Sequence, residues 1–402
     1  MNKMNKDPLF LTLSQIPLKD KTVLLRADLN VPVADGKVSD TTRLQRILPT
    51  LRELANSSAK TVILSHFGRP EGRRDDKYSL RPVAKELEKI WGAPIGFVDD
   101  CIGNTASKAV KALKPGEILV LENTRFHEAE TKNSSEFASE IAKLGDVYIN
   151  DAFSVSHRAH ASTEALARLM PRAAGRLMEE EINALESALT NPARPLAAIV
   201  GGSKISTKLE LLENLVAKVD YLVLGGGMAN TFLAAQGLNV AKSLIEKNMI
   251  ETAKRIEDNA KKHNCEIVLP CDAVVSTKME HGAHTDTVSV DKVPAGHMIL
   301  DIGPDTVNKI DDVLSLCKTI VWNGPLGAFE FKPFDSGTNA IAHIVGDLTK
   351  ENNVMSIAGG GDTVGALINS GVIDELSYVS VSGGAFLEWL EGKTLPGIEA
   401  LK

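Results

Sequence analysis

The chain has 402 residues, which is too long for one ordinary hydrophobic core and predicts about two domains. Its hydrophobic content of 43% is typical of a globular protein, and no apolar run approaches the length of a membrane span. A formal net charge of −7 argues against a protein that coats nucleic acid.

The charge is unevenly distributed along the chain. Of 45 Lys and Arg and 52 Asp and Glu, 26 and 22 lie in the first 175 residues, which leaves 19 and 30 for the remainder. The first part is therefore net positive and can still attract an acidic small molecule.

Short apolar runs in the first half alternate with stretches of helical periodicity. Many of the runs hold Val, Ile or Leu at successive positions, the pattern of strands covered on both faces in a parallel sheet. The predicted strands are 22–29, 61–66, 95–98, 117–122 and 146–151. Predicted helices between them include 40–55, 80–91 and 134–144. Such alternation indicates βαβ units with right-handed crossovers.

An acidic amphipathic stretch follows, with apolar residues at positions 178, 182, 185 and 189. This spacing predicts a helix, and the acidic residues at its start suit a helix N-terminus. The stretch ends at a segment that carries two prolines, residues 191–195. We expect this helix, residues 177–190, to join two lobes.

The second half repeats the alternation of strands and helices. The predicted strands are 196–200, 221–224, 266–270, 298–301, 318–322, 354–358 and 377–381, with helices such as 207–217 and 247–262. The predicted fold class is α/β, with two doubly wound parallel-sheet (Rossmann-like) lobes joined by a helix and a hinge. We expect the first lobe to span residues 1–176 and the second 191–384.

Charged and polar side chains follow the predicted strands of the first half. Arginine presents a fork that matches phosphate or carboxylate, and the carboxyl ends of parallel strands meet at one edge of a sheet. A single arginine at a strand end is usually a surface ion-pair partner, but several at separate strand exits favour an anion site. The predicted cluster comprises Asp28, Asn30, Arg43, His66, Arg69, Arg125 and Arg158. Arg43 follows Asp40, a predicted helix N-cap, by three residues.

Glycine follows the predicted strands of the second half. The runs Gly225–Gly227 and Gly359–Gly361 each stand between a strand and a helix, where a phosphate can approach backbone N–H groups and the helix N-terminus. A plain tight turn is the alternative for each run. Neither run belongs to a Walker A motif, and neither fits the GxGxxG pattern of a dinucleotide site.

Lys204 and Lys208 stand four residues apart at another strand-to-helix junction, beside Gly201–Gly202. Both could lean toward one polyphosphate if the helix begins near Ser206. The alternative is that they are solvated surface lysines. Asp362 is either a helix N-cap or a ligand for Mg²⁺, which usually takes only one or two carboxylates. Glu330 is either merely exposed or binds a ribose hydroxyl.

Other site chemistries find little support in the sequence. His157 and His160 could suggest a metal, but no third ligand with zinc spacing accompanies them. No GxSxG motif is present. None of the four cysteines belongs to a CxxC pair, which favours a reduced, cytoplasmic compartment.

Taken together, these segments resemble the phosphoglycerate kinase family over essentially the whole chain. In the first half the matching segments are 26–32 (RADLNVP), 65–70 (SHFGRP), 121–126 (LENTRF) and 157–160 (HRAH). In the second half they are 201–204 (GGSK), 225–228 (GGGM), 322–325 (WNGP), 359–363 (GGGDT) and 390–393 (LEGK). A single segment would be weak evidence, whereas so many in the family's order are specific.

The resemblance implies phosphoryl transfer between 1,3-bisphosphoglycerate and ADP, giving 3-phosphoglycerate and MgATP. It implies that the cluster of the first half holds the phosphoglycerate. The residues implied on the nucleotide and Mg²⁺ side are Lys204, Lys208, Gly225, Gly226, Asn323, Pro325, Glu330, Gly359, Gly360, Gly361, Asp362 and Thr363. The resemblance also implies a monomer, with residues 385–402 packing back on the first lobe. From the net charge and the lack of a long apolar run, we expect neither nucleic acid nor a membrane as a partner.

One segment departs from the family pattern. Val381 and Ser382 stand where a threonine and a glycine are usual, although Gly383 and Gly384 remain. We expect this segment to act as a hinge. We also expect Lys204 and Arg43, one from each lobe, to flank the transferring group as the catalytic residues. A nicotinamide dehydrogenase would need the missing GxGxxG pattern, and a non-enzymatic nucleotide-binding scaffold would not need the basic cluster.

Overall fold

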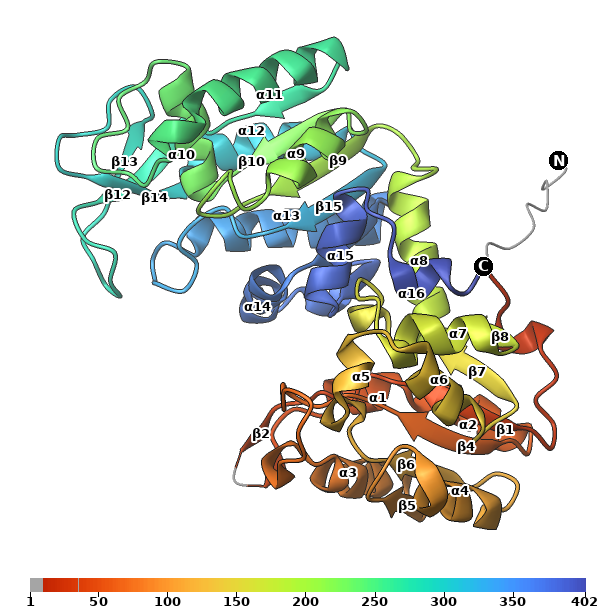
Figure 1. Cartoon of the computed structure of the whole chain (residues 1–402). Coiled ribbons are helices and arrows are strands. Elements are labelled where there is room, and N and C mark those ends of the chain that lie inside the picture. The colour runs from red at the N-terminus through yellow and green to blue at the C-terminus, as the bar shows by residue number, and fades with distance from the viewer. Residues whose placement is uncertain (1–9, 35) are drawn as a thin grey trace, which may run out of the picture. The chain divides into compact units, whose positions relative to one another are not determined.

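Two six-stranded parallel sheets form the framework of the computed structural model, which describes residues 10–34 and 36–402 (Figure 1). The first nine residues of the predicted first lobe therefore lie outside the described residues. The chain divides into two compact units, one formed by the chain up to Ile182 with Thr394–Lys402, the other by Asn183–Lys393.

The first sheet has the strand order β5-β6-β4-β1-β7-β8, with every neighbouring pair parallel. Its strands are β1 (Thr22–Arg26), β4 (Lys60–Leu64), β5 (Ile95–Val98), β6 (Ile118–Leu121), β7 (Val147–Asn150) and β8 (Arg172–Ala174). β1 lies inside the sheet, with β4, β6 and β5 on one side of it and β7 and β8 on the other. This reversal of strand order is where open α/β sheets bind ligands.

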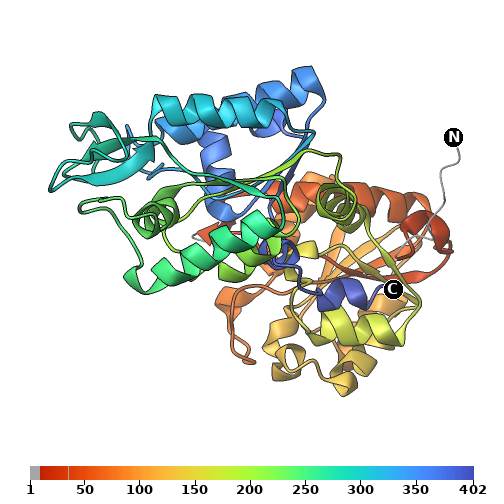
Figure 2. The same ribbon diagram turned by 90° about the horizontal axis from the view of Figure 1, so that it is seen from above.

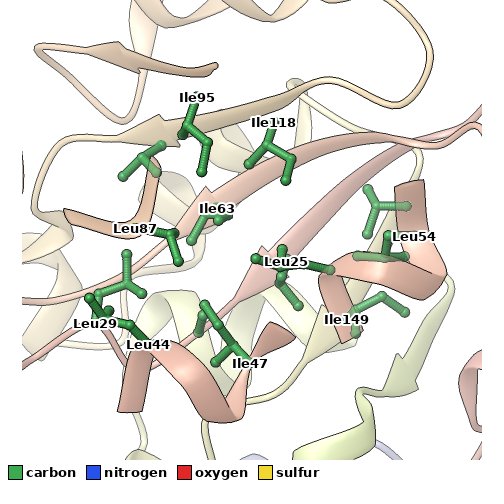
Figure 3. Close-up of a cluster of buried hydrophobic side chains, with 14 of the residues drawn as sticks. Leu25, Leu29, Leu44, Ile47, Leu54, Ile63, Leu87, Ile95, Ile118 and Ile149 are labelled. Atoms are coloured by element: carbon green, nitrogen blue, oxygen red, sulfur yellow. The ribbon is translucent and has the colours of Figure 1, made fainter. Parts of the chain in front are cut away.

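Helices cover both faces of this sheet (Figure 2). This unit contains α1 (Thr42–Arg46), α2 (Leu48–Asn56), α3 (Arg81–Trp91), α4 (Gly103–Ala112), α5 (Glu128–Thr131), α6 (Ser135–Ala142), α7 (Leu166–Leu169) and α16 (Pro396–Glu399). On one face, Leu25, Ile63 and Ile149 of the strands pack with Leu54 of α2 and Leu87 of α3 (Figure 3). A short antiparallel pair, β2 (Val33–Ala34) and β3 (Lys37–Val38), follows β1.

The helix predicted over residues 40–55 is two helices. α1 ends and α2 begins at Ile47, and Pro49 lies in the first turn of α2. Proline has no N–H to continue the hydrogen-bond ladder of α1, so it is tolerated only where a new helix starts.

The second sheet has the order β11-β10-β9-β15-β16-β17 and is also parallel throughout. Its strands are β9 (Leu196–Val200), β10 (Tyr221–Leu224), β11 (Glu266–Val268), β15 (Thr319–Asn323), β16 (Met355–Gly359) and β17 (Tyr378–Ser380). The strand order reverses between β9 and β15. The predicted class, α/β with two parallel sheets covered by helices, is confirmed.

Helices flank the second sheet on both sides (Figures 1 and 2). They are α9 (Leu209–Val216), α10 (Gly226–Ala235), α11 (Ile250–Lys262), α12 (Pro304–Ser315), α13 (Ser336–Asn352), α14 (Gly361–Ser370) and α15 (Gly383–Leu390). Ile310, Ile341 and Leu367 bring α12, α13 and α14 into one core with Ile199 and Ile320 of the strands.

A separate antiparallel sheet in the second unit corrects the expectation of parallel strands only. Its order is β13-β12-β14, formed by β12 (Asp272–Ser276), β13 (Asp286–Ser289) and β14 (Met298–Ile302). The run 298–301 belongs here. β13 escaped prediction because it is an edge strand with three of its four residues exposed, so it lacks an apolar pattern.

The predicted connecting helix is α8 (Arg176–Leu189), and its apolar positions 178, 182, 185 and 189 are buried. Asp151, which follows β7, accepts a hydrogen bond from the Met178 N–H at 3.0 Å and so caps the helix start. Among the described residues, no helix combines the length and apolar character needed to cross a membrane.

Candidate functional site

In the first unit, the segment after β1 ties three strand exits together. Asp28 accepts hydrogen bonds from the Arg43 guanidinium at 2.9 Å and from the Ser154 hydroxyl. Asn30 accepts one from the Gly68 N–H, beyond β4, at 2.9 Å. The Arg43 side chain keeps 34% of its surface exposed, so it is held in place yet remains accessible to a ligand.

The N-cap expected at Asp40 is displaced by one residue. α1 begins at Thr42 with Thr41 at the N-cap position, and Asp40 accepts from the Thr42 N–H at 2.8 Å and from its hydroxyl at 2.6 Å. The short Asp40 side chain satisfies the N–H two residues ahead, so the cap falls between them. Arg43 still lies in the first turn of α1.

His66, which follows β4, is buried and lies against a second buried cation. The Arg26 guanidinium contacts its Nδ1 at 3.2 Å. Burial first, and then the charges of Arg26, Arg125, Arg158 and His160, hold the pKa of His66 well below its usual range. Arginine can only donate hydrogen bonds, so the Nδ1 of this neutral imidazole accepts and the Nε2 carries the proton.

Further hydrogen bonds fix Arg26 behind His66. Its Nε donates to the Ser162 hydroxyl at 2.9 Å, and the Glu130 carboxylate accepts from the Ser162 N–H at 2.9 Å and from its hydroxyl. Arg26, Ser162 and Glu130 are fully buried. The prediction did not assign Arg26 a role, although it lies two residues before Asp28, and strand alternation places such residues on one face.

Arg125 lies in a short turn after β6 and donates to the Gly68 carbonyl at 2.7 Å. Burial first, and then the charges of Arg158 and Arg26, lower its pKa to about 10. Its Nε is buried, and it has no hydrogen-bond partner in the part of the chain that the structure describes. A buried cation with an unsatisfied donor among other cations is arranged to receive an anion.

Repulsion between cations shows which of the predicted residues lie together. Arg125 is affected by Arg158, Arg26 and the exposed Arg69. The pKa of His160 is lowered to about 4, by burial first and then by Arg125, Arg26 and Arg158. The structure thus brings His66, Arg69, Arg125 and Arg158 into one group, and Arg43 is joined to it through Asp28, Asn30 and Gly68. His160, considered in the sequence only as a metal ligand, is held neutral beside this cationic group.

In the second unit, Asn323 and Lys208 join the strand exits at the reversal of strand order. The Lys208 ammonium donates to the Gly201 carbonyl at 2.7 Å and to the Asn323 side chain at 2.6 Å. The Asn323 amide donates to the Gly359 carbonyl at 2.8 Å. Burial lowers the pKa of Lys208 to about 8, while the nearby Asp362 carboxylate raises it. The Lys208 ammonium therefore lies between the segments that follow β9 and β15.

Three helices begin at strand exits of the second sheet, α10 after β10, α14 after β16 and α15 after β17. Gly226 and Gly360 adopt positive φ angles of 67° and 101°, which only glycine takes easily. A Cβ on Gly201 would lie 1.8 Å from the Pro325 carbonyl oxygen, so the segments that follow β9 and β15 approach too closely for any side chain at Gly201. Such exits present free N–H groups to a phosphate.

Two local expectations in this unit are wrong. α9 begins at Leu209, with Lys208 at its N-cap position, so Lys204 and Lys208 do not share a helix face: Lys204 is exposed and Lys208 turns inward. Asp362 is no N-cap, because α14 already begins at Gly361. For Lys208 the reason is its hydrogen bond to the Asn323 side chain, 115 positions away, which the local sequence does not reveal.

The remaining predicted residues divide into buried and exposed groups. The Thr363 hydroxyl accepts from the Gly324 N–H at 2.7 Å and donates to the Gly359 carbonyl at 2.9 Å, so it holds the loops together. Asp362 and Glu330 are exposed. A single exposed carboxylate at a helix N-terminus fits a Mg²⁺ ion that takes its other ligands from phosphates and water.

The chain is similar to known proteins over nearly its whole length. A family model described as phosphoglycerate kinase matches residues 13–393. The phosphoglycerate kinase of Methylorubrum extorquens (strain PA1) is 56% identical over 386 residues, 96% of each chain, and that of Rhodospirillum centenum is 57% identical over 392 residues, 98% of this chain and 99% of the relative.

The chain is also similar to solved structures of phosphoglycerate kinases. The phosphoglycerate kinase of Coxiella burnetii has a TM-score of 0.91 and 42% identity, and each chain covers 98% of the other. The Pyrococcus horikoshii enzyme has a TM-score of 0.80 and 31% identity, covering 97% of this chain and 98% of its own.

Proposed function

We propose a direct, in-line phosphoryl transfer for this chain, which belongs to the phosphoglycerate kinase family. Members of that family are phosphotransferases with a carboxyl group as acceptor, and membership implies the glycolytic kinase reaction. The reaction exchanges a phosphoryl group between 1,3-bisphosphoglycerate and ADP and yields 3-phosphoglycerate and MgATP. The observation that carries the proposal is the cationic group beside the strand-order reversal of the first sheet.

The first unit is assigned the phosphoglycerate. Arg125 has an unsatisfied buried donor, and His66 presents a protonated Nε2 because Arg26 occupies its Nδ1. Arg69 and Arg158 add charge, and Asp28 and Asn30 hold Arg43 at the same edge. A carboxylate and a phosphate on one small molecule would satisfy these donors.

The second unit is assigned the nucleotide. The N-termini of α10 and α14 and the buried ammonium of Lys208 favour its phosphates. Mg²⁺, which would screen the phosphate charge when bound, would take Asp362 as its protein ligand. Glu330 is assigned to a ribose hydroxyl, and the glycines with Pro325, Asn323 and Thr363 shape the loops.

The chemistry explains why these residues are cations and backbone donors. In the ATP-consuming direction the nucleophile is a carboxylate that is already ionised at neutral pH, so no general base is required. The barrier lies in bringing together a carboxylate, a phosphate and a triphosphate, and phosphoryl transfer is catalysed mainly by positioning and charge stabilisation. We assign Arg43 and the exposed Lys204 to the two sides of the transferring group.

Arg43 and Lys204 belong to different units, so the mechanism requires the two lobes, predicted as 1–176 and 191–384, to close. The α8 helix and the segment 381–386 are the proposed hinges. Small-angle scattering should show a smaller radius of gyration with both substrates bound than with either alone. An unchanged radius would count against closure. The monomeric state and a cytoplasmic location are part of the same proposal.

A coupled assay tests the activity itself. Purified protein is supplied with 3-phosphoglycerate and MgATP, and a dehydrogenase consumes the acyl phosphate as it forms. We expect turnover that needs both substrates. Nucleotide binding without turnover would instead favour a non-enzymatic scaffold. Arg125→Met should raise KM for 3-phosphoglycerate and leave the Kd of ADP unchanged, which separates the two proposed sites.

A further inference from the structure

Three residues with metal-binding side chains meet at one edge of the first sheet, apart from the cationic group. Asp100 and Cys101 follow β5, and His127 follows the turn after β6. β5 and β6 are parallel neighbours, with Ile95 opposite Ile118. Their carboxyl ends therefore lie side by side, which brings together residues separated by more than twenty positions in the chain.

The ligand atoms of the three side chains are close enough to share one ion. The Asp100 Oδ1 lies 2.9 Å from the His127 Nε2, and these two atoms and the Cys101 Sγ all lie within 4.8 Å of one another. The Cys101 N–H donates to the Asp100 Oδ1 at 2.7 Å, which fixes the carboxylate. The His127 ring rests against Phe137, with centroids 5.0 Å apart, which restricts its rotation.

Burial differs among the three in a way that suits a half-open site. Cys101 has only 1% of its surface exposed and is a free cysteine, and no other described residue forms a hydrogen bond with its sulfur. Asp100 and His127 keep 45% and 30% of their side-chain surfaces exposed. An ion could enter from solvent past the carboxylate and the imidazole and reach the sulfur below them.

We propose that Asp100, Cys101 and His127 form a binding site for a divalent cation of the Zn²⁺ class. One sulfur, one imidazole nitrogen and one carboxylate oxygen are the donor types that Zn²⁺ takes, and three protein ligands leave a fourth position for water. The ion would take the place of the hydrogen bond between Asp100 and His127, and the imidazole would bind it through Nε2 as the tautomer that carries its proton on Nδ1. Thiolate formation would release the Cys101 proton to solvent, and the cation would stabilise the buried sulfur charge.

A purely structural role is the alternative, in which the Asp100–His127 hydrogen bond only holds the turn that carries Arg125. The two explanations differ in what they predict for Cys101, which has no part in that hydrogen bond. A cation site requires its sulfur as a ligand, whereas the structural role does not.

Cobalt titration of the full chain under reducing conditions distinguishes them, because a thiolate bound to Co²⁺ gives a near-ultraviolet charge-transfer band. We expect this band to saturate at one Co²⁺ per chain and to disappear when Zn²⁺ is added. Cys101→Ser should abolish the band. Cys265→Ser, which alters another buried free cysteine, should retain it and serves as the matched control.

His127→Gln keeps the thiol and keeps the proposal testable if Cys101→Ser fails to fold. It should weaken Co²⁺ binding at least about tenfold, since even changes behind a ligand have effects of this size. Circular dichroism would confirm the fold of each variant. Absence of the band in the native chain, its persistence in Cys101→Ser, or native affinity in His127→Gln would each overturn the proposal. None of these readouts depends on phosphoryl transfer.

Discussion

Replacement of Gly201 by alanine tests whether the close approach of the segments that follow β9 and β15 shapes the proposed nucleotide site. The added Cβ would lie 1.8 Å from the Pro325 carbonyl oxygen and 2.8 Å from that of Gly324. Real Cβ contacts stay beyond 3.0 Å, so the backbones must separate by at least about 1.2 Å. The Gly201 N–H bond to the Asn323 carbonyl, now 3.1 Å, would then be lost.

The magnitude follows from these two effects. Overpacking costs about 1–3 kcal/mol and a lost backbone hydrogen bond about 1 kcal/mol, so we expect Gly201→Ala to lower the free energy of unfolding by about 2–4 kcal/mol. The Lys208 ammonium would also lose its hydrogen bond to the Gly201 carbonyl. We therefore expect the Kd for ADP to rise at least about tenfold, which is a loss of roughly 1.4 kcal/mol of binding free energy.

Urea unfolding and calorimetric ADP binding measure both quantities. Gly365→Ala is the matched control, because it lies within α14 and its Cβ would meet nothing closer than Phe329 at 3.8 Å. It should stabilise the protein by about 0.5–1 kcal/mol, as alanine does in a helix interior. A loss below about 0.5 kcal/mol in Gly201→Ala, with native ADP affinity, would refute the reasoning.

Three further predictions concern the cations and the pH dependence. Lys204→Ala and Arg43→Ala should each lower kcat by on the order of 100-fold, as loss of a preorganised charge does, and a near-normal kcat in the coupled assay would contradict the assigned role. Arg26→Met should release the fixed His66 tautomer, visible in nitrogen NMR shifts, and raise KM for 3-phosphoglycerate by roughly tenfold or more, with partial recovery in Arg26→Lys; an unchanged tautomer and KM would count against a positioning role. Burial raises the pKa of Asp301 to about 8. The native state then holds a proton that the unfolded chain releases near pH 4, so between these values the stability falls by about 1.4 kcal/mol per pH unit as the pH rises. Urea unfolding from pH 5 to 8 should show a flatter profile for Asp301→Asn, and parallel profiles would disprove it.

Much of the fold follows from local pattern. The strands β5, β9 and β10 have the predicted bounds, because short runs of Val, Ile and Leu between helical stretches leave few alternatives. The pattern also missed β12, although its residues are largely buried, and it missed two features with weaker signals. β13 is exposed and polar, and the break at Ile47 depends on a single proline.

The sequence by itself determined which chemistry stands at each strand exit, since residue types and strand ends are local properties. Only the tertiary structure decided where the long side chains go. Lys208 turns inward because it meets an Asn323 side chain 115 positions away, while Lys204 stays in solvent. Arg26 lies behind His66 because Ser162, 136 positions away, accepts its hydrogen bond. A long cationic side chain turns toward the buried acceptors that hydrogen-bond its charge. These acceptors come from segments that only the folded chain brings together.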